Sequence, residues 1–399
     1  MKEAMGITTD GITAERLRTA LRNDEFRLVY QPVVSVYTGH VVGAEGLLRW
    51  HPEGGGAVPP GTFIPVAERL GLIGEITRTI FERVRTDAAL LRDLDDMLQI
   101  SMNIGASDLQ NGPFIAEVEA AFASGSLKPG QIIFEVTEHS ALKFAREEYD
   151  AFSRLLRLGV RFAMDDYGTG HANLSSLYNA PFSKLKLDRS FIQDLATDEK
   201  KRIIVRDSIR MGHLLEMQIV AEGVEDATTL QLLQDAGCEE IQGFFFSQPL
   251  PMREFIAFLR GWDQTTYQNI RGLLYLAQVD HLEWRKHLID SVFRFDAARD
   301  DRRELFRHGN INPAMCRFGH WYYGAGDALR ELPEFRAIET PHSDLHFIAH
   351  ELITEGTRED RDISAMVGHA RELTRKSLAV LELLSRLEEV LFLQGYDSH

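Results

Sequence analysis

The sequence predicts a TIM-like (β/α)8 barrel, an α/β fold, with an antiparallel first strand, followed by an all-α four-helix-bundle domain. Three observations predict this fold class. Strand-like and helix-like stretches alternate as far as Pro251. Two strand-like runs near the start are joined by a short turn, which is typical of a hairpin. Beyond Pro251 no convincing strand occurs, and helical patterns continue to the C-terminus.

The first elements form the predicted hairpin. A short helical pattern within residues 1–24 precedes strand-like runs at 25–36 and 41–50, which flank Tyr37-Thr38-Gly39-His40. Helical patterns then cover 62–93, 108–123, 140–157, 190–213 and 225–236. The strand-like runs between and after them are LQISMNI, QIIFEV, VRFAMDD, KLKLD, QIVAEGV and EIQGFFF. Alternation of this length predicts a largely parallel sheet that closes into a barrel.

The stretch RFAMDDYGTG, residues 161–170, is the centre of this pattern. An apolar run is followed directly by Asp165 and Asp166 and then by Gly168, which is typical of a buried strand that ends in a turn. One interpretation is an Asx-type turn that caps the next helix. The other is a metal site, because two adjacent carboxylates repel each other unless a proton or a cation lies between them.

Other strand ends carry the same kind of side chain, which favours the metal site. The polar residues at the ends of the runs are Glu45, Asn103, Glu135, Glu138, Asp165, Asp166, Lys186, Asp188, Glu222, Glu225 and Gln242. A barrel gathers the C-terminal ends of its strands at one face. Carboxylate and amide oxygens without sulfur suit Mg²⁺ or Mn²⁺. Two such ions with a nearby lysine activate water and clamp a phosphoryl group, so we expect a metal-assisted phosphodiester hydrolase.

Composition restricts the classes of function. The 399 residues suit two domains, and a hydrophobic content of 44% is ample for packed cores. A formal net charge of −16 argues against broad nucleic-acid binding. No apolar run is long enough for a membrane span, and the N-terminus lacks a signal-peptide pattern. Cys238 and Cys316 are the only cysteines, so a reducing, cytoplasmic location is expected.

Residues of about 10–262 resemble an EAL domain, the cyclic di-GMP phosphodiesterase module. The segments that carry this resemblance are YQPVVS, GAEGLLRW, FIPVAERLGLI, MNIGASDL, FEVTEH, AMDDYGTGHANLSSL, KLDRSFI, VAEGVED and QGFFFSQPL. They run through the whole predicted barrel in order. The resemblance implies a barrel with an antiparallel first strand, in agreement with the predicted hairpin, and hydrolysis of cyclic di-GMP to linear pGpG.

The resemblance also implies roles for the strand-end residues. Glu45, Asn103, Glu135 and Asp165 would bind one Mg²⁺ or Mn²⁺, and Asp166 would serve a second ion with Asp165 shared. The implied catalytic residues are Lys186, Glu222, which reaches the metals, Gln242, near the attacking water, and Glu138, which would hold the loop after the Asp pair. The implied substrate contacts are Gln31, Glu45, Leu47, Arg49 and Glu68.

Three departures from the family pattern leave this set intact. Gly46 replaces the alanine of the signature tripeptide, His171-Ala172 replaces an aromatic-Ser pair, and Phe244 follows Gln242-Gly243 where tyrosine is usual. None removes a proposed metal ligand or the lysine, so catalytic competence is expected rather than loss of activity.

The second part of the chain predicts a helical domain. We expect the barrel to occupy 1–262, a helical linker 263–280 and a helical zinc-binding domain 281–399. Helical patterns cover 281–294, 334–356 and 362–394. The last of these carries an apolar stripe made of Ile363, Val367, Leu373, Leu378, Leu381, Leu384 and Leu387. Part of this stripe is expected in the core, and the rest is a candidate dimer seam.

Histidine and cysteine carry the chemistry of this helical part. His342 and His346 are four positions apart, so they project from one helical face and can bind a single ion. With Cys316 and His281 they make a tetrahedral set that suits Zn²⁺. A solvated or packed histidine pair and a buried structural cysteine are the alternatives. His350 extends the same face, and His287 and His320 are competing ligands.

The segments VDHLEWRKHLID, CRFGHWYYGAG and LPEFRAIETPHSDLHFIAHEL resemble a chemoreceptor zinc-binding (CZB) domain over about 270–395. The resemblance implies that His281, Cys316, His342 and His346 bind one Zn²⁺. It also implies a helical bundle, commonly dimeric, that is attached to signalling outputs. Zinc keeps the Cys316 sulfur deprotonated, and its oxidation would weaken the site.

The prediction for function is therefore a metal-dependent cyclic di-GMP phosphodiesterase, regulated by zinc binding or thiol oxidation at the C-terminal domain. A homodimer is expected. The first alternative is a catalytically silent cyclic di-GMP receptor that acts through partner proteins. The second is a zinc or oxidant sensor whose barrel is only a scaffold.

Overall fold

The computed structural model describes residues 11–36, 38–141, 146–168, 182–215, 217–262, 270–295, 312–324, 326, 329–358 and 360–393. The chain divides into two compact units. The first comprises residues 1–233 and 238–266, and the second comprises 267–399 with 234–237. No helix in the described part of the chain combines the length and the apolar character that a membrane span requires.

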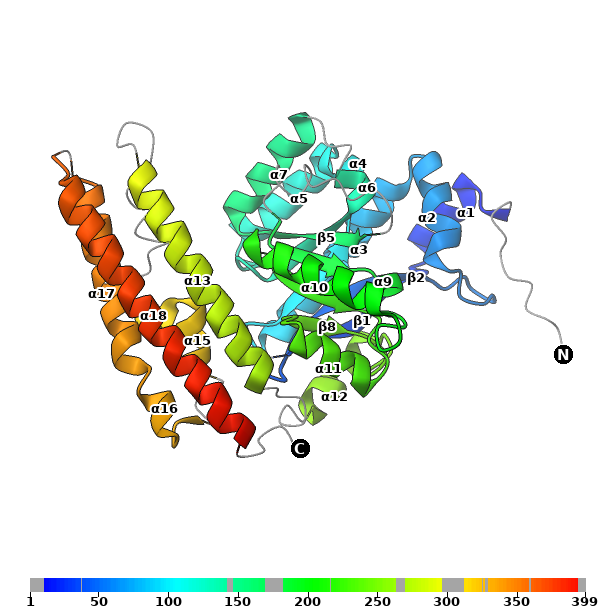
Figure 1. The fold of residues 1–399 in the computed structure, drawn as a ribbon. Coiled ribbons are helices and arrows are strands. Elements are labelled where there is room, and N and C mark those ends of the chain that lie inside the picture. The colour runs from blue at the N-terminus through cyan, green and yellow to red at the C-terminus, as the bar shows by residue number, and fades with distance from the viewer. Residues whose placement is uncertain are drawn as a thin grey trace. The chain divides into compact units, whose positions relative to one another are not determined.

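The first unit is a closed barrel whose strands lie side by side in sequence order (Figure 1). Its strands are β1 (Phe26–Ser35), β2 (Val41–Trp50), β3 (Gln99–Asn103), β4 (Ile132–Thr137), β5 (Arg161–Tyr167), β6 (Lys184–Leu187), β7 (Gln218–Glu222) and β8 (Glu240–Gln242). β1 pairs antiparallel with both β2 and β8, and the other neighbours pair in parallel. The predicted barrel with an antiparallel first strand is confirmed.

Helices surround this barrel. They are α1 (Ala14–Arg22), α2 (Pro60–Arg69), α3 (Ile73–Arg92), α4 (Ala106–Leu109), α5 (Gly112–Ala123), α6 (Glu138–Ala141), α7 (Arg146–Leu158), α9 (Arg189–Ile192), α10 (Glu199–Leu214), α11 (Ala227–Asp235) and α12 (Met252–Gly261). Phe26, Trp50 and Phe63 pack against one another with ring centroids 5.5–5.6 Å apart and join the hairpin to α2. The helix predicted over 62–93 is two helices, because Gly71 with φ of +68° ends the first.

The register of the strands explains why polar side chains meet. Gln31 lies opposite Glu45 in the β1–β2 pair, Asn103 opposite Glu135 in β3–β4, and Glu222 opposite Gln242 in β7–β8. Side chains two positions apart on one strand point to the same face. The polar residues therefore occupy neighbouring positions at one end of the barrel.

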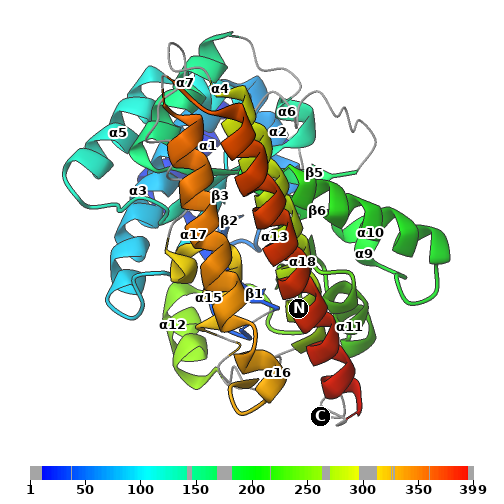
Figure 2. The same cartoon turned by 60° about the vertical axis from the view of Figure 1, so that its left-hand side comes forward.

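The second unit is helical, as predicted. It contains α13 (Ile270–Arg294), the 3₁₀ turn η3 (Pro313–Met315), α15 (Arg317–Tyr322), α16 (Pro333–Arg336), α17 (Glu339–Gly356) and α18 (Ile363–Leu393). Both ribbon views show α13, α17 and α18 running side by side (Figure 2). Their shared core includes Leu288, Val292, Leu352, Met366 and Leu373. The helix α13 begins inside the stretch predicted as a linker and continues unbroken into the predicted bundle.

The apolar stripe of α18 is only partly core. Leu373, Leu384 and Leu387 are fully buried, whereas Ile363 and Leu378 are more than half exposed. The division within the stripe follows the helical period, since the buried leucines share the face that packs on α13 and α17.

Candidate active site

The C-terminal ends of the barrel strands place one lysine among four carboxylates. Lys186 on β6 is buried, and its Nζ lies 3.2 Å from Glu45, 2.8 Å from Glu135, 3.1 Å from Asp165 and 2.6 Å from Glu222. These carboxylates come from β2, β4, β5 and β7. One ammonium group therefore faces an excess of buried negative charge.

Two amides complete the network around Lys186. Asn103 Nδ2 donates to Glu45 Oε1 at 3.1 Å and to Glu135 Oε2 at 3.3 Å. Gln242 Nε2 donates to Glu45 Oε2 at 2.7 Å and to Gln31 Oε1 at 3.0 Å. Buried amide donors fix the orientation of a carboxylate. Glu45 is held in this way from two sides.

Burial and mutual repulsion shift the pKa values of the cluster. Burial alone would lower the pKa of Lys186, but the surrounding carboxylates raise it well above its ordinary value. Burial, followed by the Glu45 charge, raises the pKa of Glu135 well above its ordinary value. Burial also raises the pKa of Glu222 to about 8. Such shifts mark a site with more negative charge than its own cation balances.

Asp165 and Asp166 differ in environment although they are adjacent. Asp165 is buried in the cluster, and burial raises its pKa. Asp166 has a positive φ of +56°, and its amide donates to Asp165 Oδ1 at 3.0 Å. Burial and the Asp165 charge raise the pKa of Asp166 to about 6. A non-glycine residue in the left-handed region costs on the order of 1 kcal/mol and is over-represented at functional sites.

These residues fit a site for hard divalent cations. Oxygen atoms of Glu45, Glu135 and Asp165 lie within 4.8 Å of one another and are buried. Carboxylate and amide oxygens are the ligands that Mg²⁺ and Mn²⁺ prefer. The raised pKa values reflect repulsion among these carboxylates, and bound cations would relieve it.

A pocket of about 330 Å³ opens beside the cluster at the barrel mouth. Its walls include Gln31, Glu45, Leu47 and Arg49, four of the five residues that the family resemblance implies as substrate contacts. Glu68, the fifth, is exposed on α2 and is absent from the residues that line this pocket. The charge of Glu68 nevertheless acts on Asp108, which lies in α4 and caps the N-terminus of that helix by accepting from the Gly105 amide.

Glu138 contacts the segment that follows the Asp pair. It is buried at the start of α6, and its Oε2 accepts from the Gly168 amide at 3.3 Å. His171 and Ala172, two of the noted departures, lie outside the described residues.

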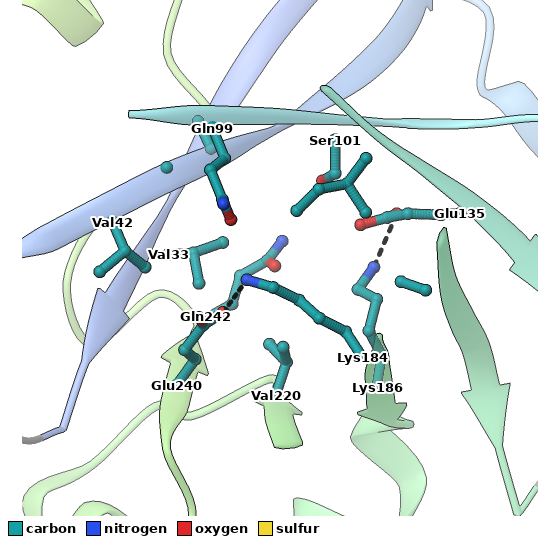
Figure 3. A pocket seen from close by; sticks show the side chains of 14 residues that line it. Val33, Val42, Gln99, Ser101, Glu135, Lys184, Lys186, Val220, Glu240 and Gln242 are labelled. Carbon is teal, nitrogen blue, oxygen red and sulfur yellow. Dashed lines mark hydrogen bonds and ion pairs between the residues drawn. The ribbon is translucent and has the colours of Figure 1, made fainter. Parts of the chain in front are cut away.

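A second polar layer beneath the cluster was not predicted (Figure 3). Lys184 Nζ lies 2.5 Å from Glu240 Oε2, and both side chains are buried. They line a small cavity of about 20 Å³ that Lys186 and Gln242 also line. The signal was the i, i+2 spacing: Lys184 with Lys186 on β6, and Glu240 with Gln242 on β8, share the inner face.

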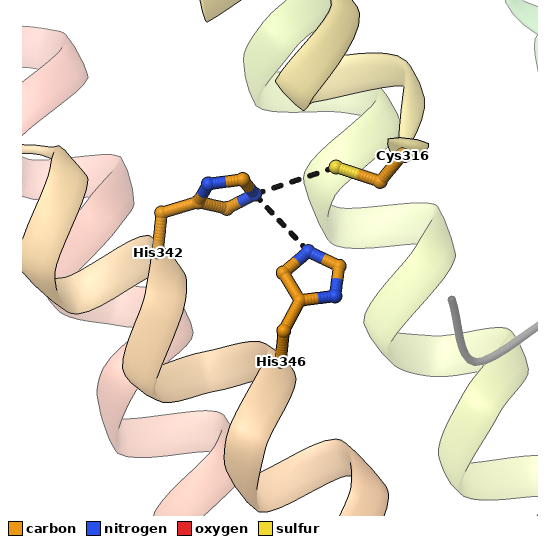
Figure 4. A group of neighbouring side chains, drawn as sticks. All are labelled: Cys316, His342 and His346. Atoms are coloured by element: carbon orange, nitrogen blue, oxygen red, sulfur yellow. Dashed lines mark hydrogen bonds between the residues drawn. The ribbon is translucent and has the colours of Figure 1, made fainter. Parts of the chain in front are cut away.

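The helical unit holds a compact group of three candidate metal ligands (Figure 4). The Nε2 of His342 lies 3.3 Å from Cys316 Sγ and 3.1 Å from the Nε2 of His346. The histidines are on α17, and Cys316 is the N-cap of α15, where its Sγ accepts from the Gly319 amide at 3.0 Å. All three residues are buried.

These distances fit zinc. A tetrahedral ion with Zn–N bonds of 2.0–2.1 Å separates two nitrogens by about 3.3 Å. Burial lowers the pKa of His342 to about 3, so its imidazole is neutral at pH 7. Neutral imidazole and thiolate are the forms that bind zinc.

His281 lies outside the 4.8 Å group but belongs to the same neighbourhood. It is buried on α13, and burial, followed by the charges of Arg285 and His346, lowers its pKa to about 4. Its Nε2 has no hydrogen-bond partner in the described part of the chain. His350 is half-buried on α17, while the side chains of His287 and His320 lie outside the description.

The fold and the barrel site define a class: α/β barrels whose strand ends carry a buried carboxylate cluster suited to divalent cations. Comparison with known proteins narrows this class. Residues 14–249 match the EAL domain, and residues 281–353 match the chemoreceptor zinc-binding domain. The chain belongs to the EAL domain family, and its helical part carries a chemoreceptor zinc-binding domain.

Individual relatives agree with this assignment. Signaling protein YkoW of Bacillus subtilis is 40% identical over 243 residues, which are 61% of this chain and 30% of the relative. The bifunctional diguanylate cyclase/cyclic di-GMP phosphodiesterase MucR of Pseudomonas aeruginosa is 35% identical over 242 residues, 60% of this chain and 35% of the relative. The chain thus spans about a third of the length of these curated relatives.

Two solved structures are similar to the barrel unit. The PaMucR phosphodiesterase in its c-di-GMP complex has 36% identity and a TM-score of 0.56, covering 60% of this chain and 98% of that chain. The FimX EAL domain from Pseudomonas aeruginosa, bound to c-di-GMP, has 25% identity and a TM-score of 0.55, covering 63% and 98%.

Proposed function

We propose that this chain hydrolyses cyclic di-GMP to linear pGpG with Mg²⁺ or Mn²⁺, and that zinc binding or thiol oxidation in the helical unit regulates the reaction. One observation carries the proposal: Glu45, Glu135, Asp165 and Glu222 converge on Lys186 at the mouth of an EAL-family barrel. The relatives named as cyclic di-GMP phosphodiesterases support the choice of substrate.

In this proposal Glu45, Asn103, Glu135 and Asp165 hold one ion, and Asp166 with Asp165 holds the second. When bound, the ions supply a nucleophilic water at neutral pH and neutralise charge on the phosphoryl oxygens. Glu222 on β7 would contribute a further carboxylate to the same group of ligands. The side-chain amides of Asn103 and Gln242 already fix the orientation of Glu45, one of the proposed ligands.

The remaining residues act on the substrate side of the site. Lys186 stays charged, because four carboxylates surround it, and it supplies a fixed positive charge beside the developing phosphorane. Gln242 lies between Glu45 and Gln31 and orients the attacking water through its amide. Gln31, Leu47 and Arg49 form the pocket wall that binds the dinucleotide. Glu138 holds the segment after the Asp pair through Gly168.

A hydrolysis assay tests the barrel. The full chain with cyclic di-GMP and Mg²⁺ or Mn²⁺ should yield pGpG, and Glu45→Ala or Lys186→Ala should abolish the product. Tight binding without turnover in either metal would instead support the receptor function. Absence of both binding and turnover would reject cyclic di-GMP as the ligand and leave the barrel as a scaffold.

We also propose that Cys316, His342, His346 and His281 bind one Zn²⁺ in the domain that begins at about residue 281. Metal analysis should find about one tightly held zinc per chain. Cys316→Ala and His342→Ala should each lose it, and unchanged zinc content in both variants would reject the site. A peroxide would oxidise the thiolate to a sulfenate and release zinc.

Regulation and assembly complete the proposal. Hydrolysis rates measured with and without zinc chelation should differ. Equal rates would show that the zinc site does not affect the activity. The exposed part of the α18 stripe, including Ile363 and Leu378, supports a homodimer. Size-exclusion chromatography with light scattering should then give twice the mass of the chain.

A further inference from the structure

A small cavity lies inside the barrel, beneath the carboxylate cluster. It has a volume of about 20 Å³, and its walls include Gln99, Ser101, Lys184, Glu240 and Gln242. The side chains of Lys184, Glu240 and Gln242 are all buried. A space of this size accommodates one water molecule where polar groups surround it. The cavity therefore has the dimensions and the walls of an internal water site.

Gln242 brings an unsatisfied oxygen to this cavity. Its Nε2 donates to Glu45 Oε2 at 2.7 Å and to Gln31 Oε1 at 3.0 Å, but its Oε1 has no hydrogen-bond partner in the described part of the chain. Figure 3 shows the amide of Gln242 pointing into the space that the two lysines and Ser101 surround. A buried carbonyl oxygen without a donor is costly, so this atom requires one.

Lys184 has donors that can meet this requirement. Its ammonium group bears three N–H donors, and its one hydrogen bond among the described residues goes to Glu240 Oε2 at 2.5 Å. A water molecule in the cavity can accept from Lys184 Nζ and donate to Gln242 Oε1. The cavity walls carry two ammonium groups and two carboxylates, so neither a cation nor an anion is favoured over a neutral ligand.

The orientation of Gln242 depends on such a donor. Rotating its amide by half a turn would place Oε1 against the oxygens of Glu45 and Gln31 and would lose both Nε2 contacts. A donor on the cavity side stabilises the orientation in which Nε2 faces Glu45. Removing outer groups that orient a metal ligand typically costs about 10–100-fold in metal affinity or activity.

We infer that the cavity binds one water molecule, which accepts from Lys184 Nζ and donates to Gln242 Oε1. Lys184 and Glu240 are positioning residues: Glu240 holds the ammonium group, the ammonium group holds the water, and the water holds the amide that orients Glu45. This inference rests on the proposed function, in which Glu45 binds Mg²⁺ or Mn²⁺, and adds two residues beneath the metal site.

The test is a mutant cycle whose readout is the Mn²⁺ affinity of the full chain, measured by electron paramagnetic resonance. The double variant Lys184→Met, Glu240→Leu removes both charges together, so no unpaired charge stays buried. The binding that Glu45→Ala abolishes defines the barrel site. The double variant should weaken this site at least about 10-fold. Gln242→Leu should weaken it by a similar factor, and combining all three replacements should add no further loss beyond about twofold.

Two further variants separate the donor from the ion pair. Lys184→Gln with Glu240→Gln keeps an N–H donor beside the cavity without any charge, and it should retain most of the Mn²⁺ affinity. Arg154→Met with Glu119→Leu is the control, because it removes a 2.6 Å ion pair between the outer helices α7 and α5. It should leave the Mn²⁺ affinity unchanged.

A crystal structure of the wild type tests the water directly. It should show a water molecule about 2.7–3.2 Å from both Lys184 Nζ and Gln242 Oε1. An empty cavity would overturn the water site. An unchanged Mn²⁺ affinity in the double variant would overturn the positioning role. Equal losses from the double replacement in the wild-type and Gln242→Leu backgrounds would overturn it too, because the ion pair would then act on the barrel as a whole.

The failure of the proposed function has a different signature. A wild-type chain that binds Mn²⁺ no better than Glu45→Ala would reject the metal site in the barrel. The crystallographic water would then decide the inference by itself, since the contacts of Lys184 and Gln242 with the water do not require a bound metal.

Discussion

Lys186 is the residue on which the barrel site depends. Its ammonium balances part of the charge of four buried carboxylates, so replacement by methionine leaves those groups without a cation. Removing one partner of a buried ion pair costs about 3–5 kcal/mol. We predict that Lys186→Met lowers the unfolding free energy of the metal-free protein by this amount, and that Mn²⁺ restores stability but not turnover.

Urea denaturation with and without Mn²⁺ measures this effect. Lys128→Met is the matched control, because Lys128 forms only a 3.8 Å contact with Asp96 and is half exposed. It should change the stability by less than about 0.5 kcal/mol. A metal-free Lys186→Met protein as stable as the wild type would mean that the carboxylates do not depend on the lysine.

The histidines of the helical unit give a second prediction at this scale. Burial lowers the pKa of His281 to about 4 and of His342 to about 3, against 6.5 in an unfolded chain. At pH values between these folded-state pKa values and 6.5, the unfolded state binds more protons than the folded state. The stability of the metal-free unit therefore falls as the pH falls. The loss approaches about 1.4 kcal/mol per pH unit for each histidine.

Denaturation of the zinc-free protein at pH values from 7 to 5 checks this slope. His342→Asn removes one of the two titrating groups and should flatten the dependence. Stability that stays constant or rises as the solution is acidified would show that the imidazoles are not held neutral.

At the scale of elements, β6 and β8 each carry two inward polar residues. The lower pair, Lys184 and Glu240, forms an isolated buried ion pair. We predict that Lys184→Met and Glu240→Leu each destabilise the barrel by about 3–5 kcal/mol, whereas the double variant is close to wild type. Thermal denaturation of the three variants measures this cycle. A double variant as unstable as the singles would show that the pair is required in itself.

The helix α18 permits an equally direct comparison. Leu384 is fully buried and Leu378 is 57% exposed on the same helix. Leu384→Ala should cost about 2–5 kcal/mol of unfolding free energy, because it leaves a cavity in the core of the helical unit. Leu378→Ala should change the free energy by less than about 0.5 kcal/mol in a monomer. A larger loss for Leu378→Ala that depends on protein concentration would locate the dimer seam on this face.

The types of the elements could be predicted, because the alternation of strand-like and helical patterns is visible in the local sequence. The residues at which the elements begin and end could not. The hairpin of β1 and β2 follows from two runs and a short turn, and the antiparallel first strand follows from the hairpin. The break at Gly71 depends on a backbone conformation that an otherwise helical pattern hides. The continuity of α13 through the predicted linker depends on packing against α17 and α18, which no local pattern contains.

The candidate site was predictable to the extent that it lies at strand ends. Topology alone brings Glu45, Glu135 and Asp165 together, since a barrel aligns its C-terminal edges. The direction of the Glu68 side chain could not be predicted in this way, because Glu68 lies on a helix and its direction depends on how α2 packs. The pair of Lys184 and Glu240 was missed because a charge in a strand interior looks like an exposed position until the inner face is known.

At the scale of the whole molecule, two compact units carry two separate groups of candidate metal ligands. If zinc regulates the barrel through substrate affinity, thermodynamic linkage requires the reverse effect as well: cyclic di-GMP must change zinc affinity by the same factor. Coupling free energies between sites are typically about 1–3 kcal/mol, which corresponds to factors of about 5–150.

We therefore predict that saturating cyclic di-GMP shifts the zinc affinity of the full chain at least about fivefold, measured by competition with a zinc chelator. The measurement uses the Lys186→Ala variant with cyclic di-GMP bound, so that the dinucleotide is not hydrolysed during the titration. His342→Ala should bind cyclic di-GMP with an affinity that zinc does not change. Equal zinc affinities with and without the dinucleotide would confine any zinc effect to the catalytic rate, because reciprocity holds for binding free energies and not for kcat.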